Sequence, residues 1–228
     1  MGYLSRLSVA AMVLFAVSGA SAAPSGSDQM TLVQEATRTV DHMRTDPAFG
    51  PARDMLNRAR AVLIVPTLVK GGFIFGAEGG DGVLLERRGD RWSDPAFFAL
   101  GSASFGLQIG LEKAEIAMLV MSDRALKAIE GGNLKLGAGG GLTVVTLSGG
   151  VEGATPANLT GDLVVWTSAT GLYGGLTLNG SVIQPREEWN ERFYGRPAST
   201  AAVLEGQVMN PAADPLRRDL SDLQLASR

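Results

Sequence analysis

The sequence has no cysteine and only one histidine, His42. Without cysteine a disulfide framework cannot form, so the stability of the fold must come from its core. Zinc sites built from cysteine and histidine are excluded as well, and so is acylation at a signal-site cysteine. Hydrolases of the G-x-S-x-G type need a histidine base, and the segment SASFG around Ser104 lacks the first glycine. These absences predict a protein that is not an enzyme.

A strong charge of either sign is also missing. The chain carries 20 basic and 23 acidic residues, for a net charge of −3. Proteins that bind nucleic acid usually present a basic domain or stripe, so we expect no nucleic-acid partner. A Walker loop needs a Gly-Lys pair, and the chain contains none.

The glycine-rich stretch KLGAGGGLTVVTLSGG, residues 135–150, could in principle hold a phosphate. A dinucleotide loop needs a third glycine and a helix directly after it. Here Leu142 occupies the place of that glycine, and the β-branched run TVVTL follows it. The stretch therefore predicts a bent pair of strands, and we expect no nucleotide partner and no cofactor.

Long apolar runs are absent apart from the beginning of the chain. LSVAAMVLFAV at residues 7–17 is shorter than the roughly 20 residues that span a bilayer as a helix. It follows Arg6 and precedes the small residues ASA at 20–22, which is the pattern of a signal peptide. We expect residues 1–22 to be removed on export. The mature protein would then be periplasmic or extracellular, peripheral to a membrane and without an acyl anchor.

Helical patterns occur near both ends of the mature chain and once in its middle. Residues 31–44 place apolar side chains at helical spacing, with Thr31 and Gln34 in the positions of a capping box. Further helices are expected at 51–59 and 122–131, and after Pro185 up to Gly195. A last helix has Asp214 as its N-cap and a leucine stripe. We expect a loosely ordered connection between the helix that ends at Gly195 and the helix that begins at Asp214.

Short apolar runs separated by glycine fill the region between these helices. Runs of four to eight residues rich in Val, Ile, Phe and Leu are typical of strands, and 24 of the 30 glycines lie between positions 71 and 180. Glycine inside a strand marks a bulge, a bend or a close approach of another backbone. The pattern predicts an α+β fold with a strongly curved antiparallel sheet or a flattened barrel, surrounded by helices.

The order of these glycine-bounded runs resembles the SYLF domain. The resemblance begins at KGGFIFGAEGGDGVLLERRGDRWSDPAFFALGSASFGLQIGLEKAEIAMLVMSDRALKAI and continues through GNLKLGAGGGLTVV, GLYGGLTLNGSVI and EWNERFYG. It implies the division of the chain into a signal peptide (1–22), a lead-in with an amphipathic helix (23–49), a β-rich SYLF-like domain (50–197) and a connection with a C-terminal helix (198–228). It also implies a lipid-binding module, because eukaryotic members bind phosphoinositides. Yeast relatives bind actin, and bacterial members are exported.

Basic residues beside apolar surface are the candidate contacts for an anionic headgroup, since each contributes roughly 1 kcal/mol near a charged membrane. The most concentrated group is the hairpin that carries Trp92; a solvated turn would also explain it. Phe73 and Phe75 are expected in the core. The candidate lipid-binding residues are Arg38, Arg44, Arg58, Lys70, Arg87, Arg88, Arg91 and Trp92.

The function that the sequence predicts is non-enzymatic binding of an envelope lipid through its headgroup. Two alternatives stay open. The sheet could bind another envelope protein or a second copy of the chain, or the protein could be a hydrolase of an unrecognised type.

Overall fold

The structure is a computed structural model that describes residues 26–72, 75–105, 110–132, 134–136, 141–147, 161–168 and 181–226. The predicted signal peptide and residues 137–140 of the glycine-rich stretch lie outside this part of the chain, as do the side chains of Lys70 and Phe73 to Phe75. The helices are α1 (Gly26–Thr45), α2 (Gly50–Leu56), α3 (Asp123–Glu130), α4 (Glu187–Tyr194), α5 (Thr200–Leu204) and α6 (Asp214–Leu225), with short 3-10 turns at Pro47–Phe49 and Pro211–Ala213. The strands are β1 (Ala61–Gly72), β2 (Phe75–Arg88), β3 (Arg91–Trp92), β4 (Ala96–Phe105), β5 (Gly110–Val120), β6 (Leu134–Lys135), β7 (Val144–Leu147), β8 (Leu163–Thr167) and β9 (Val182–Pro185).

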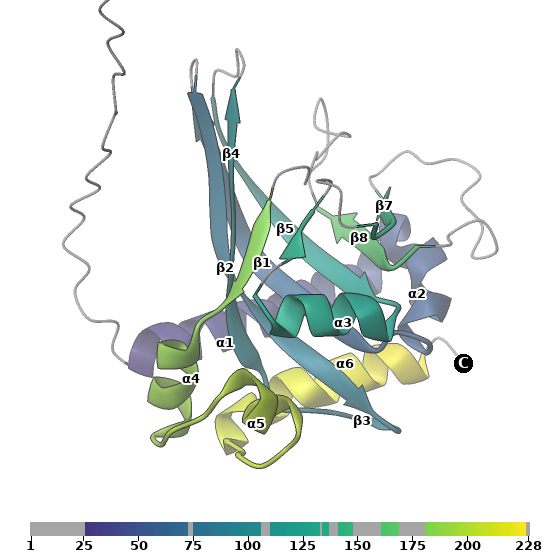
Figure 1. Ribbon diagram of the computed structural model, residues 1–228. Helices are drawn as coiled ribbons and strands as arrows, with labels where there is room; N and C mark the ends of the chain where they lie inside the picture. The colour runs from purple at the N-terminus through teal and green to yellow at the C-terminus, as the bar shows by residue number, and fades with distance from the viewer. Residues whose placement is uncertain are drawn as a thin grey trace, which may run out of the picture.

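The described strands form one nine-stranded sheet in the order β6-β9-β4-β2-β1-β5-β8-β7, with β3 paired to β2 outside this path. The prediction of an α+β fold with a strongly curved sheet is confirmed (Figure 1). The prediction that it is antiparallel throughout is wrong at one edge, because β7 and β8 are parallel. A parallel pair needs a crossover of about a dozen residues or more, and residues 148–162 provide that length.

A bulge in β1 bends the centre of the sheet. Five residue steps from Ile64 to Val69 on β1 face only four steps on β2, so β1 carries one extra residue. Pro66 lies within this bulge, where its missing N–H interrupts no regular ladder. Gly80 and Gly82 lie opposite, and a Cβ atom there would come within 2.4 Å and 2.6 Å of carbonyl oxygens of β1. Glycine at these positions allows the close approach of two backbones, as the sequence predicted.

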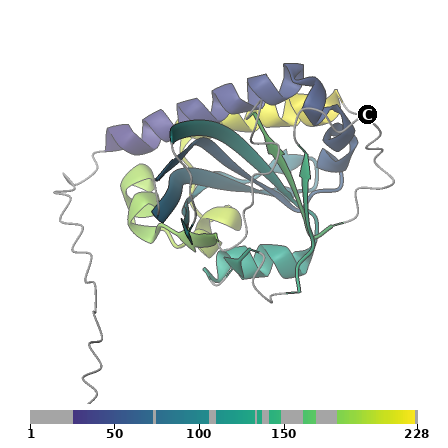
Figure 2. The same cartoon turned by 90° about the horizontal axis from the view of Figure 1, so that it is seen from above.

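Helices cover both faces of the lower part of the sheet (Figure 2). On one face α1, α2, α4 and α6 pack against alternate residues such as Val62 and Ile64. On the other, α3 and α5 pack against the residues between them, such as Leu63 and Val65. The run AVLIV at the start of β1 is therefore buried on both sides, which explains why it does not alternate with polar residues. None of the described helices has the length and hydropathy needed to cross a membrane.

The first helix is longer than its sequence pattern predicts. It begins at Gly26, and the hydroxyl of Thr31 donates to the carbonyl of Ser27 inside the helix, so Thr31 is not a cap. The added turn is held by packing, since Gln29 is fully buried there. The predicted end is confirmed, because Asp46 leaves the helix and accepts a hydrogen bond from the amide of Ala48.

The segment between α4 and α6 is ordered, contrary to the prediction of a loose connection. Ser199 caps α5, and the apolar side chains of this segment, Val203, Leu204 and Val208, are buried. Asp214 is also not the N-cap of α6: it is the first residue of the helix, and Asn210 caps the 3-10 turn before it. The leucine stripe of α6, Leu216, Leu220 and Leu223, is fully buried as predicted.

Candidate functional site

The predicted basic residues do not form one patch. Arg87 is structural: its Nε donates to the carbonyl of Ala59 at 2.7 Å and one Nη to that of Gly89 at 3.3 Å. Arg88 lies 3.7 Å from Glu86 as a surface ion pair, and Arg58 is exposed on the turn after α2. Arg87 of the hairpin therefore holds backbone carbonyl groups of the protein in place.

The basic residues of α1 are partly neutralised by their own helix. Arg38 pairs with Glu35 at 3.8 Å, and Arg44 pairs with Asp41 at 3.7 Å. Such exposed pairs one turn apart are weak, and they leave no concentrated positive charge on the helix. The predicted Lys70 belongs to β1, but its side chain lies outside the described part. The candidate contact on α1 is therefore not supported by a cluster of free cations.

Arg91 and Trp92 open onto a groove that β3 forms with α6, which we call the β3–α6 groove. Its volume is about 490 Å³, within the range of small-molecule sites. The α6 residues in its wall follow the i, i+3, i+4, i+7, i+8 spacing of one helical face, next to the buried leucine stripe. The groove is lined by Arg91, Trp92, Asp214, Arg217, Arg218, Ser221 and Asp222.

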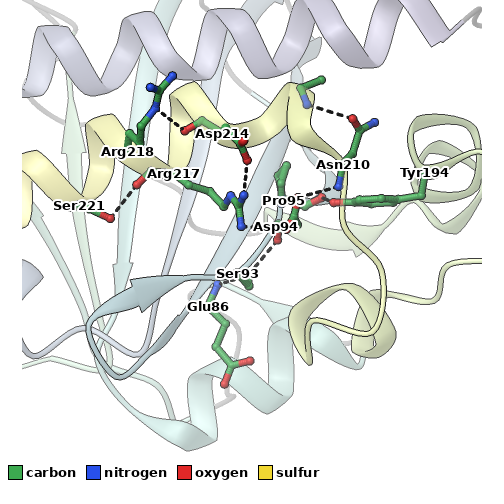
Figure 3. A network of polar contacts seen from close by, with 11 residues as sticks. Glu86, Ser93, Asp94, Pro95, Tyr194, Asn210, Asp214, Arg217, Arg218 and Ser221 are labelled. Carbon is green, nitrogen blue, oxygen red and sulfur yellow. Dashed lines mark hydrogen bonds and ion pairs between the residues drawn. The ribbon is translucent and has the colours of Figure 1, made fainter.

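Arg217 anchors the floor of the groove by ion pairs (Figure 3). One Nη lies 3.2 Å from the carboxylate of Asp94, and the other pairs with Asp214. Asp94 is only 2% exposed and accepts a further hydrogen bond from the amide of Asn210 at 3.1 Å. Burial raises the pKa of Asp94 above its ordinary value, although the Asn210 amide and Arg217 oppose this. The positive charge of Arg217 is thus largely used within the protein.

In the described part of the chain, two arginines of the groove form no ion pair and two buried donors have no acceptor. The side chains of Arg91 and Arg218 form no ion pair there; the Nε of Arg218 donates to the carbonyl of Asp214 at 3.4 Å. Trp92 is 3% exposed, and its indole N–H is buried without an acceptor, as is the Nε of Arg217. A buried donor without an acceptor costs about 1–3 kcal/mol. A ligand that brings acceptor oxygens to this groove would meet the exposed side chains of Arg91 and Arg218.

The sequence prediction named two of the seven residues that line this groove. It named Arg91 and Trp92 but treated the last helix only as a leucine stripe and missed Arg217, Arg218 and Ser221. The signal was present in DPLRRDLSDLQL, where charged residues recur one turn apart beside the leucines. What it did not contain was the information that this face meets β3.

A second groove lies between the first turns of α1 and the bulged part of β1 and β2, and we call it the acidic groove. Its volume is about 340 Å³. Its lining residues are Asp28, Thr31, Leu32, Glu35, Thr67, Val69, Gly79, Gly80, Asp81 and Trp189. Arg186 closes one side: it pairs with Asp81 at 2.6 Å and lies 4.1 Å above the ring centre of Trp189.

In the described part of the chain, the ring of the single histidine pairs with a carboxylate. His42 is 62% exposed, and its Nδ1 lies 2.9 Å from Glu115, which also accepts from Thr39. Within the described ranges no serine or threonine hydroxyl hydrogen-bonds its ring, so a nucleophile and base are not brought together. The same ranges hold no group of three or more residues suited to a metal ion.

Comparison with known proteins agrees with the resemblance seen in the sequence. Residues 101–223 match the family model Ysc84, described as "Las17-binding protein actin regulator"; this range includes most of α6. Protein YSC84 from Saccharomyces cerevisiae is 33% identical over 171 residues, which cover 73% of this chain and 36% of that protein. SH3 domain-containing YSC84-like protein 1 from Homo sapiens is 30% identical over 152 residues, 66% of this chain and 44% of its own. The chain thus spans less than half the length of these relatives.

Proposed function

The chain belongs to the Ysc84 family, and from this premise we propose that it is a non-enzymatic module that binds the phosphate of a membrane phospholipid headgroup in the β3–α6 groove. The groove brings together two arginines, Arg91 and Arg218, that form no ion pair in the described part of the chain, and this is the observation that carries the proposal. Arginine suits phosphate because its planar guanidinium offers several donors in a fixed geometry.

The surroundings of the groove favour a ligand at a membrane surface. Met209 and Leu225, with 70% and 57% of their surface exposed, are the large hydrophobic side chains that stand out as exposed in the described part of the chain. One precedes α6 and the other ends it. Exposed apolar side chains before and at the end of α6 would enter the headgroup region of a bilayer if the arginines of the groove hold a lipid phosphate. This arrangement supports a peripheral contact, without a membrane span.

The names of the relatives describe binding and regulation. The family description names Las17 binding and actin regulation, and a second yeast relative, 33% identical over 73% of this chain, is called LAS seventeen-binding protein 3. A protein partner is therefore the second candidate function for this chain. Export through the signal peptide at residues 1–22, which we also propose, would place the lipid or protein partner in the envelope.

The test is cosedimentation with vesicles of known composition. Because each basic residue near an anionic surface contributes about 1 kcal/mol, the double variant Arg91→Gln/Arg218→Gln should bind about 30-fold more weakly to phosphatidylglycerol vesicles. Neither side chain supports the fold by an ion pair, so stability should change little. Arg196→Gln removes an exposed arginine outside the groove and serves as the charge control.

Equal binding by wild type, double variant and control would exclude the groove as the lipid site. If wild type binds none of the vesicles but retains a protein through complete delipidation, the second candidate function is the correct one.

A further inference from the structure

The β3–α6 groove has a mixed charge, which a site for purely anionic headgroups does not need. Three arginines face two aspartates in its lining. Arg217 is neutralised by Asp94 and Asp214. The charges left for a ligand are those of Arg91 on β3 and of Arg218 and Asp222 on α6. Asp222 is exposed and forms no ion pair in the described part of the chain.

The spacing of these charges fits a ligand that carries both signs. Arg218 and Asp222 are four residues apart on α6, so their side chains leave the helix about one turn, or about 5.4 Å, from each other. A phosphate and an ammonium group joined by two carbons can reach both at once. The phosphate would lie between Arg91 and Arg218, and the ammonium would donate to Asp222.

The chemistry of the groove also distinguishes two kinds of zwitterion. A primary ammonium has three N–H donors and binds a carboxylate directly. A quaternary ammonium has none and is usually held by exposed aromatic faces. The aromatic ring in the lining is that of Trp92, which is almost completely buried. The groove therefore favours an ethanolamine headgroup over a choline headgroup.

We propose that the β3–α6 groove selects the phosphoethanolamine headgroup, with Asp222 as the residue that sets this selectivity. The inference rests on the proposed function, because it concerns the same site and the same phosphate contacts. It adds the class of headgroup and the residue that selects it. Removal of Asp222 should change the selectivity between headgroups, whereas loss of Arg91 and Arg218 should lower the affinity for all phospholipids.

The experiment compares vesicles with the same acyl chains: phosphatidylcholine alone, and phosphatidylcholine mixed with phosphatidylethanolamine or with phosphatidylglycerol. Wild type should bind the ethanolamine vesicles about fivefold more tightly than the glycerol vesicles, which corresponds to one additional ionic contact. Soluble phosphoethanolamine should displace the protein from the ethanolamine vesicles, whereas glycerol phosphate should do so less well. Displacement by the soluble compound shows that the headgroup itself is recognised and not the bilayer that carries it.

The variant Asp222→Asn should reverse the preference. It loses the ammonium partner and a negative charge, so binding should weaken about fivefold on ethanolamine vesicles and strengthen on glycerol vesicles. Glu191→Gln changes the net charge equally at an exposed position of α4 and should leave the ratio unchanged.

The two proposals fail in different ways. If wild type binds both vesicles equally and Asp222→Asn leaves the ratio unchanged, while Arg91→Gln/Arg218→Gln still weakens binding about 30-fold, the selectivity is wrong and the proposed function stands. If wild type binds neither vesicle, the proposed function itself is wrong.

Discussion

The two grooves of this protein contain similar residue types but relate differently to the fold. In the acidic groove, folding accounts for most of the lining. Asp81 pairs with Arg186, Glu35 pairs with Arg38, and Asp28 lies in the first turn of α1, where the helix dipole favours a negative charge. In the β3–α6 groove, Arg91, Arg218 and Asp222 take part in no such pair with any residue that the structure describes. Charged residues that the fold does not use are the better indication of a binding site.

The two grooves also differ in the surroundings of their tryptophans, although both indole N–H groups lack an acceptor. The indole N–H groups of Trp92 and Trp189 are both buried without an acceptor. Trp189 already carries Arg186 on its ring and packs against Phe97, so its place in the structure is explained. Trp92 lies in the lining of the β3–α6 groove together with Arg91 and Arg218, so the binding of a ligand there would change its surroundings.

The largest effect expected in the acidic groove is on stability. Gly80→Ala would place a Cβ atom 2.4 Å from the carbonyl oxygen of Thr67, so the bulge of β1 would have to shift. We expect a loss of about 1–3 kcal/mol in the free energy of unfolding, measured with urea. Gly79→Ala is the matched control, because its Cβ would be at an ordinary 3.7 Å from the nearest atom. A Gly80→Ala protein as stable as wild type would show that the bulge does not need this glycine.

A smaller effect is expected from the ion pair that closes the acidic groove. Arg186→Gln removes the partner of Asp81 and the cation above Trp189, which should cost about 1–2 kcal/mol in unfolding free energy. Arg38→Gln, which breaks only an exposed pair at 3.8 Å, should cost less than about 0.5 kcal/mol. Both variants should bind vesicles like wild type. A large loss of lipid binding in Arg186→Gln would move the site to the acidic groove.

The smallest effect concerns pH and the carboxylate beneath the β3–α6 groove. Burial raises the pKa of Asp94, so the folded protein takes up this proton at a higher pH than the unfolded chain. The stability that protonation of Asp94 contributes is complete below the unfolded pKa of about 3.9, and it is lost as pH rises through the folded value. Protonation also removes one of the two carboxylate partners of Arg217, while Asp214 remains.

Binding to phosphatidylglycerol vesicles should therefore strengthen a few-fold as the pH falls from neutral toward 4, at constant ionic strength. In Asp94→Asn the carboxylate is absent, so Asp94 can no longer contribute to this pH response. An unchanged pH response in that variant would show that another group controls it.

The sequence predicted those features that depend on local patterns. The leucine stripe of α6, the glycine-driven curvature of the sheet and the end of α1 before Pro47 could all be read from spacing and residue type. The start of α1 could not, because Gly26 is a poor helix former and the first turn is stabilised by tertiary packing around Gln29. The parallel pairing of β7 and β8 depends on a long connection, whose path the sequence does not specify.

The candidate site could be predicted only in part, for a similar reason. Arg91 and Trp92 were named because they lie together in a basic hairpin. Arg218 and Asp222 are more than 100 residues away in the chain, and they reach the same groove only because α6 packs beside β3. The local pattern on α6 indicated a charged face, but only the fold shows which strand that face meets.

The most direct test of the central claim uses the three tryptophans of the chain, Trp92, Trp166 and Trp189, whose indole N–H groups give separate signals in a ¹⁵N-edited NMR spectrum. The protein is titrated with a short-chain phosphatidylethanolamine below its micelle concentration. The indole signal of Trp92 should move, because Trp92 lines the β3–α6 groove and a bound ligand changes its surroundings. The signals of Trp166, which already donates to Asp46 at 2.9 Å, and of Trp189 should stay in place. Movement of the Trp189 signal with that of Trp92 unchanged would contradict the assignment of lipid binding to the β3–α6 groove.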